Sequence, residues 1–127
     1  MSFDISKEVL IDGAPADIAG VMFDPARETE WMTAVAASVP QSRGITPGAE
    51  VKRTSRVDGR DVEWSTTVDA FHFPHVLRLV IPSGGYIKYE VQRHGTGSVA
   101  RVRASGDVDV FGFDLDRLKQ LVEAART

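Results

Sequence analysis

Hydrophobic and polar residues alternate at the beginning of the chain. Phe3, Ile5, Val9 and Ile11 occupy alternate positions, and the positions between them are acidic or polar up to residue 8. This two-residue period is typical of a β-strand with one buried face. Lys7 has the same parity as the hydrophobic residues, so we expect one cationic side chain on the buried face of the strand.

The period then changes to that of helices. A turn at residues 12–15 is followed by hydrophobic residues at helical spacing up to Met22, which predicts a first short helix. Asp24 must end this helix, because the residue before a proline avoids helical geometry. Pro25 is in turn suited to the first position of a helix, so a second short helix is predicted over residues 26–32.

Turn signals recur every 8 to 15 residues from residue 44 onward. Clusters rich in glycine or proline separate alternating or apolar segments, which is the pattern of an antiparallel meander. The sharpest signal is Asp58-Gly59, because both residues tolerate the positive φ of a type I′ hairpin turn. The pattern predicts six further strands, over residues 34–43, 48–57, 60–72, 76–82, 85–94 and 98–110.

The end of the chain predicts an amphipathic helix over about residues 112–126. Its hydrophobic residues are spaced alternately by four and three positions between Phe111 and Ala125, and Asp114 can cap its start. The element order is therefore strand, two short helices, six strands and helix. This order predicts an α+β fold in which a curved seven-stranded antiparallel sheet grips the C-terminal helix.

Composition narrows the possible partners. The 127 residues are 43% hydrophobic with a formal net charge of -3, which favours one domain spanning residues 1–127. Charges of both signs are interspersed, so we expect neither nucleic acid nor membrane as the main partner. The absence of cysteine excludes disulfides and thiolate chemistry. The chain starts without signal-peptide features, and its most apolar stretch, residues 76–82, is too short to span a bilayer. These features predict a cytoplasmic protein.

Several local patterns occur in a familiar order. Residues 9–18 run from an apolar strand through a small-residue and proline turn into a helix. An Asp-Pro pair at 24–25 precedes Trp31, a glycine-rich hairpin at 95–98 precedes the last strand, and residues 115–123 end the chain with a helix. Together these markers resemble the START-like, helix-grip superfamily (SRPBCC), in particular its polyketide cyclase/dehydrase-like branch. The resemblance implies a hydrophobic cavity between the sheet and the terminal helix, and it implies no particular reaction.

Strand parity predicts which side chains line such a cavity. In the strand over 60–72 the even-numbered residues are mostly apolar, so we expect them to face inward, His72 included. Large aromatic residues in this set either form cavity walls or are ordinary core residues. The residues expected to contact a ligand are Trp31, Arg53, Trp64, Thr66, Val68, Leu77, Leu79, Ile87, Tyr89, Val102 and Leu118.

Two inward polar residues are the candidates for catalysis. Burying a polar group without a partner costs about 1–3 kcal/mol, so each must have a partner. The guanidinium of Arg53 matches a ligand carboxylate or enolate; alternatively, Arg53 reaches water or pairs with Glu50 or Glu63. The imidazole of His72 is suited to a general base because it titrates near neutral pH; alternatively, it binds backbone at a strand end.

No metal or cofactor is expected. His72 and His75 are close in sequence, but neither a third histidine nor a carboxylate lies at matching spacing. The glycines of residues 95–97 precede a strand rather than a helix, so they indicate a hairpin and not a nucleotide-binding loop.

Three functions remain open. The favoured hypothesis is binding of a hydrophobic or amphipathic small molecule, lipid-like or polyketide-like, between the sheet and the C-terminal helix. The second is a cyclase or dehydratase acting on a polyketide-like ketone, with His72 as base and Arg53 stabilising the enolate. The third is a protein-interaction module with a filled core, in which apolar sheet left uncovered by a short helix favours a homodimer.

Overall fold

The computed structural model describes residues 3–125, without the side chain of Phe3. The expected orientation of Phe3 and the expected helix end at residue 126 lie outside this description. The strands are β1 (Phe3–Ile11), β2 (Val35–Pro40), β3 (Glu50–Val57), β4 (Arg60–His72), β5 (Val76–Val80), β6 (Tyr86–His94) and β7 (Gly97–Gly106). The helices are α1 (Pro15–Met22), the 3-10 helices η1 (Pro25–Glu30) and η2 (Val108–Val110), and α2 (Leu115–Ala124). Within the described residues, no helix combines the length and apolar character that a membrane span needs.

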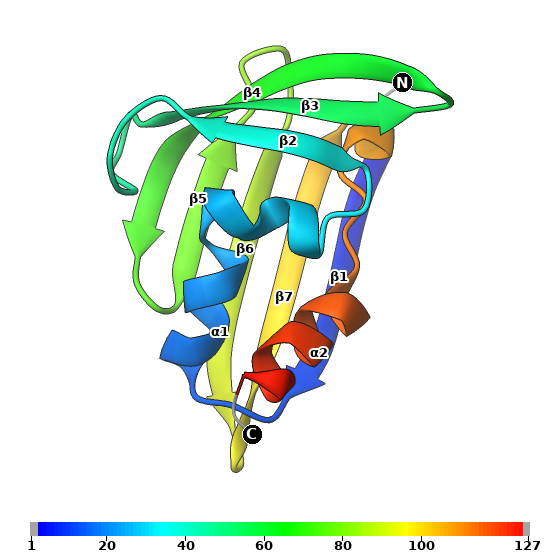
Figure 1. Cartoon of the computed structure of the whole chain (residues 1–127). Coiled ribbons are helices and arrows are strands. Elements are labelled where there is room, and N and C mark those ends of the chain that lie inside the picture. Colours follow the sequence, from blue (N-terminus) through cyan, green and yellow to red (C-terminus); the bar gives the residue numbers. More distant parts are fainter. Residues whose placement is uncertain (1–2, 126–127) are drawn as a thin grey trace.

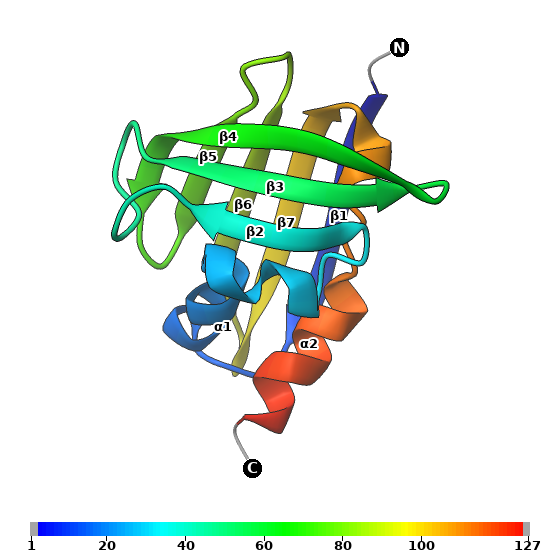
Figure 2. The same ribbon diagram turned by 45° about the horizontal axis from the view of Figure 1, so that its top comes forward.

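All seven strands form one antiparallel sheet in the order β1-β7-β6-β5-β4-β3-β2. The sheet is strongly curved, so that β2, β3 and β4 arch across the end of the other four strands (Figure 1). Figure 2 shows the same arch with its top turned toward the viewer, and α1, η1 and α2 lie on the concave side. The predicted α+β fold, with seven strands and a gripped C-terminal helix, is confirmed.

The turn between β3 and β4 has the predicted geometry. Asp58 has a φ of 52° and Gly59 a φ of 78°, both in the region that a type I′ turn requires. The flanking residues Val57 and Arg60 pair directly across the hairpin. Local sequence chemistry therefore sets the register of the longest strands of the arch.

A β-bulge interrupts the pairing of β4 with β5. Val68 pairs with Leu79, but the next residue of β5, Arg78, pairs with Ala70. Asp69 is therefore an extra residue in β4, and its carboxylate accepts a hydrogen bond from Arg78 at 2.6 Å. One inserted residue reverses the faces on which all later side chains of a strand lie.

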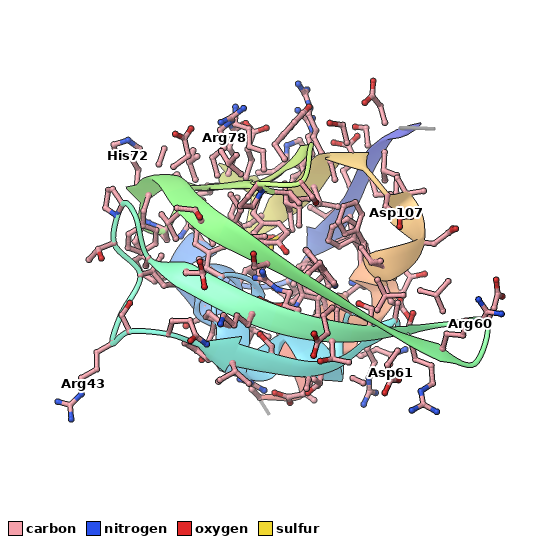
Figure 3. All side chains as sticks on the ribbon, turned by 90° about the horizontal axis from the view of Figure 1, so that it is seen from above. Arg43, Arg60, Asp61, His72, Arg78 and Asp107 are labelled. Carbon is pink, nitrogen blue, oxygen red and sulfur yellow. The ribbon has the colours of Figure 1, made fainter. Side chains whose placement is uncertain are left out.

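Because of the bulge, His72 does not have the orientation that simple alternation predicts. Beyond the bulge Phe71, not His72, pairs with the buried Leu77 and packs against the core. His72 is exposed and points away from the molecule (Figure 3). The inward orientation predicted for His72 was wrong, because simple alternation assumes a strand without an inserted residue.

The segment after β7 also differs from the prediction. The strand ends at Gly106, whose φ of 126° interrupts the extended backbone, rather than at residue 110.

Asp114 caps α2 as expected, since its Oδ1 accepts a hydrogen bond from the Arg117 N–H at 3.0 Å. The helix has 10 residues and is thus about 15 Å long, against about 30 Å for β1. It therefore packs against one end of the concave face, and η1 lies at the other end beneath β2 (Figure 1).

A continuous chain of aromatic rings fills the middle of the fold. Successive ring centroids lie 5.1–6.5 Å apart, the range in which aromatic pairs attract one another. In order, the rings belong to Phe73, Phe71, Phe23, Tyr89, Trp31, Phe113, Phe111 and Trp64. Tyr89 and Trp31, at the centre, are almost completely buried. The aromatic chain therefore occupies the space between the sheet and the helices.

Gly112 lies where the connection from η2 to α2 crosses the chain before β2. Its carbonyl accepts a hydrogen bond from the Thr33 N–H at 2.7 Å. Its φ is +64°, and a Cβ at this position would lie 2.3 Å from the Ala34 backbone nitrogen. Only glycine permits this crossing without displacing the backbone at Ala34, just before β2.

We predict that Gly112→Ala lowers the free energy of unfolding by about 2–4 kcal/mol, because positive φ and a steric clash both oppose the side chain. The matched control is Gly95→Ala. Gly95 has a similar φ of +60°, but nothing lies within 4 Å of the added carbon. The control should lose only about 1–2 kcal/mol in urea unfolding. Equal losses in the two variants would show that the crossing is not tight.

Candidate functional site

An apolar pocket opens at one end of the arch. We call it the vestibule. It lies between the β2–β3 loop, the α1–η1 junction and the β4–β5 hairpin, which Figure 1 shows on the left. Its volume is about 370 Å³. The lining residues are Ala19, Gly20, Phe23, Asp24, Pro25, Pro40, Ser42, Gly44, Ile45, Phe71 and Phe73.

A smaller space, the chamber, continues the vestibule inward. Its volume is about 20 Å³, which holds about one water-sized group. The chamber and the vestibule share six lining residues: Phe23, Pro25, Pro40, Ser42, Gly44 and Ile45. Beyond the shared wall the chamber is lined by Glu28, Ala49, Glu50, Val51, Arg53, Val68, Leu77 and Leu79. The vestibule is therefore mostly apolar, and charged side chains gather at its inner end.

Local sequence places the walls of the vestibule. Pro25 opens η1, and Asp24 caps it by accepting a hydrogen bond from the Ala26 N–H at 2.9 Å. The β2–β3 loop is held against β4, because the Gly48 N–H donates to the Val68 carbonyl at 2.8 Å. The bulge after Val68 turns Phe71 toward the same opening.

A buried ion pair forms the inner end of the chamber. Arg53, on β3, donates from Nε to Glu28 Oε1 at 2.6 Å and from Nη2 to Glu28 Oε2 at 2.8 Å. Its Nη1 donates to Thr66 Oγ1 at 2.5 Å, and its guanidinium carbon lies 4.9 Å from the centre of the Trp64 ring. The two charged side chains are only 1% and 4% exposed. Arg53 is thus inward, as parity predicts, but its partner is neither of the glutamates expected from sequence.

The ion pair exists because each charge would be costly to bury alone. Removing a carboxylate or a guanidinium from water costs several kcal/mol, and a two-pronged pair with a further acceptor offsets this cost. Glu28 lies on the inner face of η1, whereas Arg27 and Glu30 of the same helix pair with each other at the surface, 2.7 Å apart. The short 3-10 turn thereby separates a buried carboxylate from its exposed neighbours.

The predicted ligand contacts fall into two groups. Arg53, Val68, Leu77 and Leu79 line the chamber. The remaining predicted residues do not line the vestibule or the chamber: Trp31, Trp64, Thr66, Ile87, Tyr89, Val102 and Leu118. Of these, all but Trp64 are at most 1% exposed. Trp64 is half-buried, and its Nε1–H donates to Ser55 Oγ at 2.8 Å.

Tyr89 lies close to the ion pair without joining its hydrogen bonds. Its hydroxyl donates to the Met32 sulfur at 3.7 Å. Burial raises the pKa of Tyr89 far above its ordinary value, and the negative charge of Glu28 raises it further. The hydroxyl therefore stays protonated and neutral at physiological pH.

The arrangement needed for general-base catalysis is not assembled from the predicted residues. His72 is exposed and lies outside both pockets, whereas Arg53 is buried at the chamber. Figure 3 shows His72 pointing outward at the end of β4, and Arg43 pointing outward at the tip of the β2–β3 loop. The prediction that His72 acts as a general base depended on an inward side chain, and the side chain of His72 points outward.

Sequence reasoning missed most of the lining of this site, including Phe23, Glu28, Phe71 and Phe73. Simple alternation along residues 60–72 does not place Phe71 inward, because the bulge has no sequence signal of its own. Glu28 lies in a charged segment between Arg27 and Glu30 that predicts a solvated helix face. The one usable signal was Arg53, since an inward cation requires a buried acid from some other element.

We predict that Glu28→Gln lowers the free energy of unfolding by about 3 kcal/mol, because it leaves the guanidinium of Arg53 buried without its counter-charge. The control is Glu30→Gln, which removes a carboxylate from the exposed pair on the same helix. That change should cost about 0.5 kcal/mol in urea unfolding. Similar losses for both variants would contradict the importance assigned to burial of the Glu28 pair.

Comparisons with known proteins identify the fold. A scan against protein-family models gives no match, and neither does a search of curated proteins. Solved structures do match over nearly the whole chain. An AHSA1-like protein from Aeromonas hydrophila is 16% identical, with 98% of this chain and 94% of that chain covered and a TM-score of 0.71.

Two further structures extend the comparison. Ara h 8.0201 is 17% identical, with 98% and 92% of the two chains covered and a TM-score of 0.62. The di-domain ARO/CYC protein BexL is 14% identical, with 98% of this chain and 45% of that chain covered and a TM-score of 0.67. Identities this low show the fold and not the activity. The chain therefore has the helix-grip fold that these solved structures share.

Proposed function

We infer that the protein binds a small hydrophobic or amphipathic molecule in the vestibule. The observation that carries this proposal is an apolar pocket of about 370 Å³ that leads to a chamber with a buried ion pair. Small-molecule sites are typically apolar clefts of about 300–1,000 Å³ with a few polar groups at fixed positions. The helix-grip fold, shared with Ara h 8.0201 and with an ARO/CYC protein, is consistent with such a role.

The proposed site differs from the one expected between the sheet and the C-terminal helix. Trp31, Tyr89 and Leu118 fill that region, and each is at most 1% exposed. A ligand in the vestibule instead contacts Phe23, Phe71 and Phe73 at the end of the aromatic chain. Phe73 is 52% exposed, and a ligand in the vestibule covers part of this exposed apolar ring.

The volume of the vestibule limits the ligand class. A pocket near the lower end of the usual range suits a compound of one to three aromatic rings or a short acyl chain better than a whole sterol or diacyl lipid. Native mass spectrometry and thermal-shift screening against aromatic ketones, short-chain lipids and sterols tests this limit. Stabilisation by sterols alone would contradict it.

We predict that the neutral fluorophore N-phenyl-1-naphthylamine binds saturably and that Phe73→Ala weakens this binding roughly tenfold. The variant removes part of an apolar wall, and a lost contact worth about 1.4 kcal/mol corresponds to that factor. The readout is a fluorescence titration of the folded protein. Because Phe73 is half-exposed, the fold should remain intact.

The matched control for this titration is Leu10→Ala. Leu10 is 55% exposed, similar to Phe73, but it lies on β1 outside the vestibule. Its variant should bind the fluorophore as the unmodified protein does. The proposal would be contradicted if the fluorophore showed no saturable binding, or if the Leu10→Ala variant lost as much affinity for it as Phe73→Ala.

A further inference from the structure

The charged groups of the chamber bear on which ligands the vestibule accepts. Three lining residues of the chamber carry charge, namely Glu28, Arg53 and Glu50, and Asp24 is the charged residue of the vestibule lining. Arg53 is therefore the one cation among these lining residues. Its charge is already neutralised by Glu28 through two hydrogen bonds of 2.6 and 2.8 Å.

We propose that Glu28 acts as a selectivity residue: by occupying Arg53, it restricts the chamber to ligands with an uncharged polar end and excludes carboxylates. This proposal rests on the function inferred above. Arg53 would be a natural partner for a ligand carboxylate, because a guanidinium binds that group in a two-pronged manner. In this protein, that geometry is taken by a side chain of the protein itself.

A carboxylate ligand has no favourable way to enter. Displacing Glu28 would leave the Glu28 carboxylate, now 4% exposed, buried without its counter-charge. Binding beside the intact pair would bury a second negative charge next to Glu28 with no cation left to compensate it. Both routes carry the cost of an unpaired buried ion, which is several kcal/mol.

An uncharged hydroxyl or amide group faces no such cost. The chamber volume of about 20 Å³ admits one group the size of a water molecule. Each oxygen of Glu28 accepts one hydrogen bond from Arg53, which leaves lone pairs for an O–H or N–H of the ligand. The geometry therefore favours alcohols, phenols and amides attached to a small apolar body that fills the vestibule.

The test uses two probes of the same shape, naphthalene-2-carboxamide and naphthalene-2-carboxylate. Each probe is titrated at neutral pH into the full chain with bound N-phenyl-1-naphthylamine, and displacement of the fluorophore is measured. In the unmodified protein we expect the carboxamide to displace the fluorophore at a concentration at least tenfold lower than the carboxylate. In Glu28→Gln the order should reverse, because Arg53 is then free to pair with an anion.

The control is Glu30→Gln, which makes the same chemical change on the same helix outside both pockets. It should keep the preference of the unmodified protein for the carboxamide. A reversal in this variant as well would show a general effect of net charge and would overturn the proposal.

A second test measures the thermal unfolding of the destabilised Glu28→Gln variant in the presence of each probe. Naphthalene-2-carboxylate should raise its Tm by more than the carboxamide does, since the anion replaces the missing counter-charge. No carboxylate-specific gain, or equal displacement by both probes in the unmodified protein, overturns the selectivity while leaving ligand binding intact. If the fluorophore itself fails to bind the unmodified protein, the proposed function and the selectivity fall together.

Discussion

A guanidinium buried inside a β-sheet protein constrains everything placed around it. Arg53 faces inward because its neighbours Val51 and Ser55 on β3 are buried with the same parity. An unpaired charge in that position would cost several kcal/mol, a large part of the total stability of a domain of this size. The counter-charge comes from Glu28, so η1 must lie beneath the arch with its inner face against β3.

That requirement accounts for the irregular stretch between α1 and β2. A long regular helix would carry residues 15–30 straight along the sheet, whereas the break at Asp24 and Pro25 redirects the chain toward β3. The same break leaves space between the end of α1 and the β2–β3 loop. The vestibule is thus a geometric consequence of the turn that brings Glu28 to Arg53.

Features set by neighbouring residues could be read from the sequence, and features set by distant ones could not. Asp58 and Gly59 carry their own turn geometry, so the β3–β4 hairpin and the parity of Arg53 were predictable. Glu28 is 25 residues away from Arg53 in the chain and lies in an ordinary charged helix. The Asp69 bulge has no glycine or proline to mark it, and it alone moved His72 to the outer face. The resemblance to helix-grip proteins supplied the topology but placed the cavity where Tyr89 and Trp31 pack.

The chain of aromatic rings gives the molecule an optical property. Trp31 is completely buried and is connected through Tyr89 and Phe23 to the wall of the vestibule, whereas half-buried Trp64 lies against the cation of Arg53. The two indoles therefore sit in an apolar and a charged environment, and their emission should differ in wavelength and intensity. Intrinsic fluorescence can thus distinguish events at the buried centre of the aromatic chain, near Trp31, from events beside the Arg53 ion pair, near Trp64, without any added label.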